Sequence, residues 1–375
     1  MIRRLVKTFD EENNLINVLV PLTIDVEEVY FVYHHDVDTS LMKSCTSVIN
    51  KYKKINIYYK KIKKYEIDKL LNENTILDVS APKYLSIALY ENALKNNLPV
   101  IYYDDEERCV KRYNDHSIIN KDIFKLSIDD IIKLGGGKIE SNLHKPVKNR
   151  NTINKIYEAV DYASNRYTLF TSFVSRINAY INDYQSENNT FHLNERTIKK
   201  ILSDEQYHQY KDLDLFTIEG NDLTFFNDDI KKIFTVSGTF LENYIYHKLI
   251  DSNLFDEVSM SNTIEFSRAQ WHYPVTCEID CLVLKNNELL FISIKSNKVD
   301  KDALNEIKVH NVMFGNSQSK AVICSNNDLS QEKPSVYAKA EELKVYVIDN
   351  TSFKKDRLAQ DILSIIDQSY QYERI

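Results

Sequence analysis

The chain has 375 residues, of which 43% are hydrophobic and 27% charged. This balance is typical of a folded protein and excludes a disordered or fibrous one. The length allows two or three domains, each with its own core. The formal net charge of −7 excludes a strongly basic nucleic-acid-binding chain, but it is compatible with a local basic groove.

Neither a membrane span nor a secretion signal is expected. No run approaches the roughly 18 to 20 apolar residues that cross a bilayer, and residues 1–10 contain no apolar signal-like run. We therefore expect a cytoplasmic protein with no membrane partner. The cysteines are odd in number and scattered, which predicts reduced thiols instead of a disulfide framework. They are Cys45, Cys109, Cys277, Cys281 and Cys324.

The first part of the chain, from residue 18 to 119, alternates short β-branched or aromatic runs with longer helical segments. This pattern predicts an α/β sheet with crossover helices. Strands are expected at 29–34, 55–59, 75–79 and 100–103, and helices at 41–52 and 85–95. The turn from Ser80 to Lys83 then follows the carboxyl end of a strand, which is where open α/β sheets bind ligands.

The middle of the chain has a different character. Residues 124–137 predict a strand end, a short helix capped by Ser127 and a triple-glycine stop, and 142–151 predict a linker. Residues 152–210 should be helical, with a polar interruption at 182–190, and 215–226 should form a hairpin around Gly220, Asn221 and Asp222. Further on, we expect helices at 239–250, 302–313 and 334–343, and strands at 258–266, 276–284, 289–294, 321–324 and 344–348.

Two of these late strands carry a chemically suggestive pattern. Residues two apart on a strand share a face, so Glu278 and Asp280 project to one side, and Ser293 and Lys295 do the same on the next strand. A hairpin can then place two carboxylates, a hydroxyl and an ammonium side by side. Carboxylates hold Mg²⁺ or Mn²⁺, and a lysine stabilises developing negative charge, which suits phosphodiester hydrolysis. Glu242, on the preceding helix, is a candidate third carboxylate, although solvated strand faces also carry such residues without a catalytic role.

Other polar groups allow two interpretations each. Cys277 and Cys281 could bind zinc with His272, but core cysteines are favoured because a further ligand is missing. His35 could contact a ligand of the first sheet or belong to a surface pair with His34. The Trp271–Tyr273 segment could stack on a base, or it could be a packed loop, which is favoured.

Three motifs together resemble a known family. The segments GTFLE (238–242), CEID (277–280) and FISIKS (291–296) resemble the PD-(D/E)xK nuclease core, and more narrowly the nuclease half of the cyclic-oligoadenylate-activated CARF nucleases of type III CRISPR systems. LDVSAPKYLSIA (77–88) resembles the ligand-binding turn of their sensor domain, and residues 126–135 its closing element. The resemblance extends from about residue 15 to 350.

The resemblance implies an α/β chain with three parts. Residues 1–143 would form a Rossmann-like CARF sensor domain, residues 144–235 a mainly helical connector with a β-hairpin, and residues 236–375 a restriction-endonuclease-like α/β domain.

The resemblance also implies ligands and roles. Two CARF domains of a homodimer would clasp one cyclic oligoadenylate, of which cyclic tetra-adenylate suits the two-fold symmetry. The contacts would come from Ser80, Ala81, Pro82, Lys83 and His35. Asp280 would be the main ligand of Mn²⁺ or Mg²⁺, supported by Glu278, Glu242 and Ile294. Lys295 would be the catalytic lysine, with Ser293 beside it.

The expected function is therefore a cyclic-oligoadenylate-activated nuclease of antiviral defence. It would cleave single-stranded DNA or RNA with little sequence preference and could also nick duplex DNA. Two departures from the family pattern leave alternatives open: Ser293 replaces the usual acidic residue, and Ala81 and Pro82 replace two glycines. One alternative is a sensor or sink whose nuclease domain has decayed. Another is a repair or restriction endonuclease that needs no cyclic adenylate.

Overall fold

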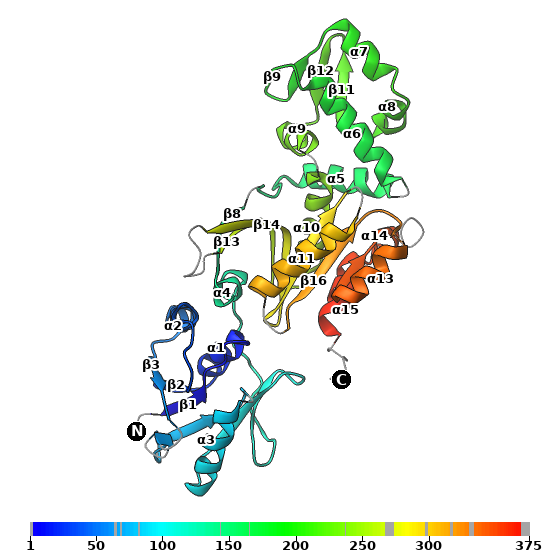
Figure 1. Ribbon diagram of the computed structural model, residues 1–375. Coiled ribbons are helices and arrows are strands. Elements are labelled where there is room, and N and C mark those ends of the chain that lie inside the picture. Colours follow the sequence, from blue (N-terminus) through cyan, green and yellow to red (C-terminus); the bar gives the residue numbers. More distant parts are fainter. Residues whose placement is uncertain are drawn as a thin grey trace. The chain divides into compact units, whose positions relative to one another are not determined.

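A computed structural model describes residues 3–63, 66–67, 70–81, 83–142, 144–164, 166–236, 238–266, 274–296, 299–315, 318–329 and 334–368 (Figure 1). The chain divides into two compact units. The first comprises residues 1–139, 265–276 and 312–319, and the second comprises residues 140–264, 277–311 and 320–375. Within the described residues, no helix has both the length and the apolar character needed to cross a bilayer.

The first unit is built on a seven-stranded sheet in the order β3-β2-β1-β4-β5-β6-β7. In this sheet, β3, β2, β1, β4 and β5 are parallel to one another. Strands β6 and β7 are antiparallel to their neighbours. This confirms the α/β class, the four predicted strands and both predicted helices. The elements are β1 (Arg4–Thr8), α1 (Asn14–Thr23), β2 (Glu28–Tyr33), α2 (Thr39–Tyr52), β3 (Asn56–Lys61), β4 (Thr75–Asp78), α3 (Tyr84–Lys95), β5 (Val100–Asp104), β6 (Cys109–Arg112), β7 (Ile118–Asn120) and α4 (Ile128–Leu134).

The central strand β1 was not predicted. It lies between β2 and β4 and is followed by α1, while β4 is followed by α3, so the chain leaves these neighbouring strands in opposite directions across the sheet. Loops after such a pair of strands border the crevice in which open α/β sheets bind ligands. The predicted turn after β4 therefore has a partner, the loop after β1.

The closing part of this unit corrects one expectation and confirms two. Residues 121–127 contain no strand, so the strand end expected near residue 124 is wrong. The Ser127 cap is confirmed, because its side chain and that of Asp130 form a reciprocal capping box. The triple-glycine stop is also confirmed, because α4 ends at Leu134 with Gly135 as its C-cap, and Gly137 then begins strand β8 (Gly137–Asn142).

The second unit contains most of a six-stranded sheet in the order β17-β16-β15-β14-β13-β8. Its central hairpin joins β14 to β15 through Asn286 and Asn287, both with positive φ angles of 52° and 65°, a conformation that asparagine tolerates. The elements are α10 (Thr239–Ser252), β13 (Glu257–Phe266), β14 (Val275–Lys285), β15 (Glu288–Lys295), α11 (Lys301–Phe314), β16 (Lys320–Ser325), α13 (Pro334–Leu343), β17 (Val345–Ile348), α14 (Asn350–Lys354) and α15 (Leu358–Asp367). Every strand and helix predicted for this region is confirmed.

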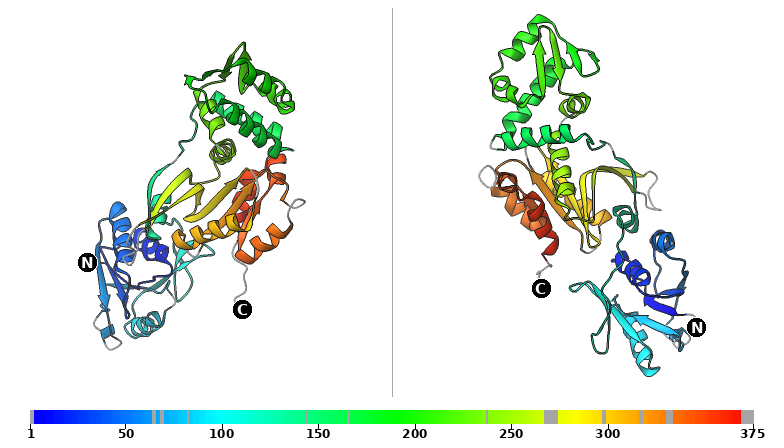
Figure 2. Two further views of the ribbon diagram at one scale, coloured as in Figure 1. Left: turned by 45° about the horizontal axis from the view of Figure 1, so that its top comes forward. Right: turned by 180° about the vertical axis from the view of Figure 1, so that it is seen from behind.

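The segment before α10 belongs to the same unit and shares its hydrophobic core. Figure 2 shows its helices and short strands in shades of green. The predicted hairpin is confirmed as β11 and β12, with Gly220 at φ 61° in the turn. The polar tract at 182–190 was expected only to interrupt the helices, but it contains β9 and the start of β10, which join β12 in a small antiparallel sheet. The elements are α5 (Arg150–Ala163), α6 (Tyr167–Ile181), β9 (Ser186–Glu187), β10 (Thr190–His192), α7 (Glu195–Leu202), α8 (Glu205–Tyr210), η2 (Lys211–Leu213), β11 (Phe216–Glu219), β12 (Asp222–Phe225) and α9 (Asp228–Thr235).

Candidate functional site

The predicted polar face of the β14–β15 hairpin is present. Cys281 lies opposite Ile292, and this register brings Asp280 next to the end of β15. Asp280 Oδ2 accepts a hydrogen bond from the backbone N–H of Ile294 at 2.6 Å and from Ser293 Oγ at 3.3 Å. Asp280 is thus held by the two residues that precede Lys295, so the aspartate and the lysine belong to one local arrangement.

Glu242 reaches this arrangement from α10. Ser261 Oγ of β13 donates a hydrogen bond to Glu242 Oε2 at 3.3 Å. Gly238 begins the helix at φ 88°, and a Cβ atom placed there would lie 3.2 Å from Glu242 Oε1. The positive φ angle favours glycine at position 238, and a side chain there would also crowd the Glu242 carboxylate.

Burial disfavours the ionisation of all three carboxyl groups, and neighbouring carboxylates add to this effect for the two glutamates. Loss of hydration, together with the charges of Asp280 and Glu278, raises the pKa of Glu242 to about 7, against the opposing effects of Ser261 and Lys295. Loss of hydration and Asp280 likewise raise the pKa of Glu278. Loss of hydration also raises the pKa of Asp280, although the bond from Ile294 and the charge of Lys295 work against it. Lys295, which makes no ion pair within the described part of the chain, leaves the negative charge only partly balanced.

Four neighbouring side chains were missed by sequence reasoning. Glu306 raises the pKa of Asp280, and Asp280 and Lys295 both influence the pKa of His310. Glu306 and His310 lie four residues apart on α11, a spacing that puts them on one helix face and could have identified them. His144 lowers the pKa of Glu278, and Glu242 adds to the effect of burial in raising the pKa of Tyr167. Nothing in the local sequence around His144 or Tyr167 indicates that these residues lie near the carboxylates.

The donor set suits a hard divalent cation. Carboxylate oxygens are the preferred ligands of Mg²⁺ and Mn²⁺, and a cation would relieve the repulsion that raises these pKa values. Among the described residues, however, no three His, Cys, Asp or Glu side chains are gathered as a preformed metal site. The zinc alternative gains no support, because Cys281 is buried, Cys277 is half-buried and both are free. His272 and the rest of the Trp271–Tyr273 segment lie outside the described residues.

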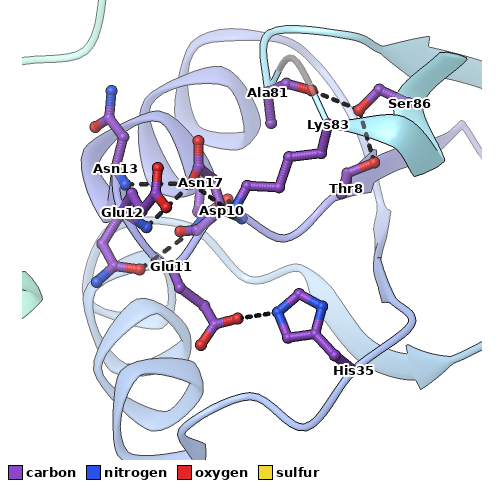
Figure 3. A network of polar contacts seen from close by, with 11 residues as sticks. Thr8, Asp10, Glu11, Glu12, Asn13, Asn17, His35, Ala81, Lys83 and Ser86 are labelled. Atoms are coloured by element: carbon purple, nitrogen blue, oxygen red, sulfur yellow. Dashed lines mark hydrogen bonds and ion pairs between the residues drawn. The ribbon is translucent and has the colours of Figure 1, made fainter.

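Three of the residues predicted to bind a ligand in the first unit, Ala81, Lys83 and His35, lie in a polar network at the ends of β1, β2 and β4 (Figure 3). Lys83 Nζ lies 3.2 Å from Asp10 Oδ1, and His35 Nε2 lies 2.6 Å from Glu11 Oε1. Asp10 Oδ1 also accepts hydrogen bonds from the backbone N–H groups of the next turn. Sequence reasoning missed these acidic partners because it did not predict the strand that carries them to this place.

The turn itself is partly occupied by structural hydrogen bonds. The Ser80 hydroxyl donates to Asp78 Oδ1 and accepts from the backbone N–H of Tyr103 at 2.9 Å. The side chain of Ala81 is buried and its carbonyl accepts from Ser86 Oγ. Pro82 lies outside the described residues. Within this turn, Lys83 is thus the predicted residue whose side chain offers a positive charge to an anion.

Several solved structures have a similar fold. A protein from Vibrio cholerae, VC1899, matches over 96% of this chain and 97% of its own, with a TM-score of 0.78 and 15% identity. Can2 from Sulfobacillus thermosulfidooxidans, in complex with cyclic tetra-adenylate, matches over 97% and 99% with a TM-score of 0.72 and 14% identity. The chain has the fold of these proteins.

A third structure is a type III CRISPR defence DNA nuclease activated by cyclic oligoadenylate. It matches over 87% of this chain but 45% of its own, with a TM-score of 0.50 and 12% identity. No family model and no curated protein matches the sequence. The fold that the sequence resemblance implied is therefore confirmed over nearly the whole chain.

Proposed function

We propose that the protein is a nuclease activated by a cyclic oligoadenylate, most suitably cyclic tetra-adenylate, and dependent on Mn²⁺ or Mg²⁺. The observation that carries the proposal is the cluster of Glu242, Asp280 and Lys295 in a chain that shares its fold, end to end, with a cyclic-tetra-adenylate-binding protein. Its substrate would be single-stranded DNA or RNA, with nicking of duplex DNA as a further outcome. Residues 1–143 would act as the sensor, 144–235 as the connector and 236–375 as the nuclease domain.

The side chains of the cluster divide the chemistry among them. Asp280, with Glu278, Glu242 and the backbone of Ile294, would hold the cation, which supplies Lewis acidity at the scissile phosphate. Lys295 would stabilise the negative charge that develops on that phosphate. Ser293 would fix the orientation of Asp280 through the observed contact at 3.3 Å.

The polar network of Figure 3 would receive the activator. Lys83 and His35 are the candidate contacts with phosphate and ribose, and Ser80 and Ala81 would contribute through the backbone of the turn. The sensor would work as a homodimer around the ring. An exposed apolar stripe on α3 supports this, since Tyr84, Ile87 and Leu94 are 63%, 59% and 45% exposed directly after the ligand turn.

The test is a cleavage assay in the presence of Mn²⁺ or Mg²⁺. Labelled single-stranded DNA, single-stranded RNA and supercoiled plasmid are incubated with and without cyclic tetra- or hexa-adenylate, alongside Asp280→Ala. Cleavage that requires a cyclic adenylate and disappears in the variant supports the proposal, and cleavage without any cyclic adenylate would indicate an ungated endonuclease. In the cell, we expect this activity to serve type III CRISPR antiviral defence in the cytoplasm.

A second candidate is favoured by one observation. Ser293 supplies a hydroxyl at the position where the resembled family carries a carboxylate, and a hydroxyl is a weaker metal ligand. A sensor or sink would bind the ring tightly and cleave none of the substrates with either metal.

A further inference from the structure

A groove in the second unit lies beside the carboxylate cluster. Its cavity has a volume of about 510 Å³ and is formed by the segment that precedes α5, by α9 and by the start of α10. The residues that line it are His144, Lys145, Pro146, Val147, Lys148, Asp229, Lys232, Ile233, Val236, Thr239 and Asn243.

The charge of this groove is opposite to that of the chain. Three exposed lysines line it, Lys145, Lys148 and Lys232, against one acidic residue, Asp229. Lys145 and Lys148 make no ion pair with any residue that the structure describes, and Lys232 has only a long contact of 3.7 Å with Asp228. In a chain with a formal charge of −7, three lysines of which two have no ion pair among the described residues form a local site of positive potential.

Hydrogen bonds to α10 fix the segment that forms one wall of the groove. The backbone N–H of Val147 donates to Asn243 Oδ1 at 3.0 Å, and Asn243 Nδ2 donates to the carbonyl of Thr239 at 2.8 Å. Val147 is also buried. The two lysines on either side of Val147 are therefore held at a fixed place against α10.

The same contacts connect the groove to the cluster. Asn243, which fastens the lysine segment, directly follows Glu242 on α10. The wall of the groove that α10 forms through Thr239 and Asn243 thus belongs to the same helix that carries Glu242.

We infer that this groove binds the sugar–phosphate backbone of the nucleic-acid strand that is cut at Asp280 and Lys295. A lysine ammonium contacts phosphate as a point charge and does not distinguish one base from another. Such contacts suit a substrate strand of any sequence. The inference rests on the proposed nuclease function and adds the path by which the substrate reaches it.

The experiment measures strand binding separately from cleavage. The variant Lys145→Ala/Lys148→Ala/Lys232→Ala is compared with the parent and with Lys199→Ala/Lys354→Ala/Lys355→Ala, which removes three exposed lysines of the same unit that do not line the groove. Anisotropy of a fluorescent single-stranded oligonucleotide is recorded across a salt series, with cyclic tetra-adenylate and with Ca²⁺ replacing Mn²⁺. Cleavage rates are then measured in Mn²⁺.

The groove variant should bind the oligonucleotide roughly 50-fold more weakly at physiological salt, and its salt slope should fall by about 2, because three phosphate contacts release fewer counterions. The control triple variant should bind like the parent. In cleavage, KM should rise while kcat changes little, as expected for uniform binding. The triple Lys→Arg variant of the groove should retain binding.

Two results would overturn the inference: oligonucleotide binding by the groove variant that equals that of the control, or a parent protein that binds no strand. If no condition gives cleavage but the groove variant still loses binding, the proposed nuclease function fails while the groove remains a strand-binding site. If cleavage requires a cyclic adenylate and Asp280, yet the groove variant binds the strand normally, the proposed nuclease function is supported and the groove is not its strand-binding site.

Discussion

Each unit contains buried ionisable groups, and the two sets are balanced differently. In the first unit, Lys7 Nζ lies 2.8 Å from Asp78 Oδ2, and both side chains are at most 1% exposed. Lys7 also donates to the carbonyl of Ile16 at 2.6 Å, and Asp78 accepts from the backbone N–H of Ser80 at 2.9 Å. This pair is one cation with one anion, and both have further hydrogen bonds.

In the second unit, three carboxyl groups share one lysine. The pKa values of Glu242, Glu278 and Asp280 are all raised, by lost hydration and, for the two glutamates, by the neighbouring carboxylate of Asp280. Buried charges without full compensation are disfavoured, so a fold that keeps them gains nothing in stability from doing so. The difference indicates a structural role for the Lys7–Asp78 pair, which supports the ligand turn, and a binding role for the carboxylate cluster.

The largest effect on stability should come from breaking the balanced pair. Lys7→Met leaves Asp78 buried without its cation, and we expect the local free energy of unfolding to fall by about 3–5 kcal/mol. Hydrogen exchange should then accelerate in peptides from β1 and β4, with no change in β15. Lys7→Met/Asp78→Asn, which removes both charges, should recover most of the loss. A single variant as stable as the parent would show that the pair is not a structural element.

In the carboxylate cluster the largest effect should be on activity. Lys295→Met removes the cation next to Asp280, and cleavage should slow by roughly 100- to 1000-fold because the developing phosphate charge loses its partner. Oligonucleotide and cyclic tetra-adenylate binding should be retained. Lys285→Met, at the turn end of β14, is the matched control and should cleave normally. Equal loss in both variants would contradict a specific role for Lys295.

The two units also differ in how far the sequence predicted them. The β14–β15 hairpin could be found because two apolar runs flank a short turn that carries two asparagines. Strand β1 could not, because its five residues include Arg4 and Lys7, and charged residues argue against a central strand. Lys7 is tolerated there only because Asp78, from a strand distant in sequence, neutralises it.

The candidate site shows the same limit. Glu278, Asp280, Ser293 and Lys295 were identified because strand spacing alone places them on one face. The four-residue spacing of Glu306 and His310 places them on one face of α11, but whether that face packs against the cluster depends on tertiary contacts that the spacing does not specify. In the first unit, likewise, Lys83 was predicted as a ligand contact, but its partner Asp10 follows the strand that was missed.

Substitution of Ser293 tests whether the cluster binds a metal ion. Ser293→Asp adds a carboxylate beside Asp280, from which Ser293 Oγ now lies 3.3 Å away. Without metal, the added like charge should lower the melting temperature. With Mn²⁺, the concentration needed for half-maximal thermal stabilisation should fall roughly tenfold, because affinity rises with the number of charged ligands. Ser293→Asn is the neutral control of the same size, and a response equal to that of the aspartate variant would argue against a cation at this cluster.

The smallest effect is expected at Asp10, the only acidic residue that pairs with Lys83 among the described residues. A carboxylate 3.2 Å from this lysine competes with the phosphates of an anionic ring, so Asp10→Asn should tighten cyclic tetra-adenylate binding by a few fold. The asparagine oxygen can still accept the two backbone hydrogen bonds of the next turn, which preserves the loop. Calorimetric titration measures the change, with Asp36→Asn, an exposed pair partner of Lys61 in the same unit, as the control. Weaker binding by Asp10→Asn alone would mean instead that Asp10 orients Lys83 toward the ligand, and that this ionic pair, like Lys7 with Asp78, is part of the scaffold.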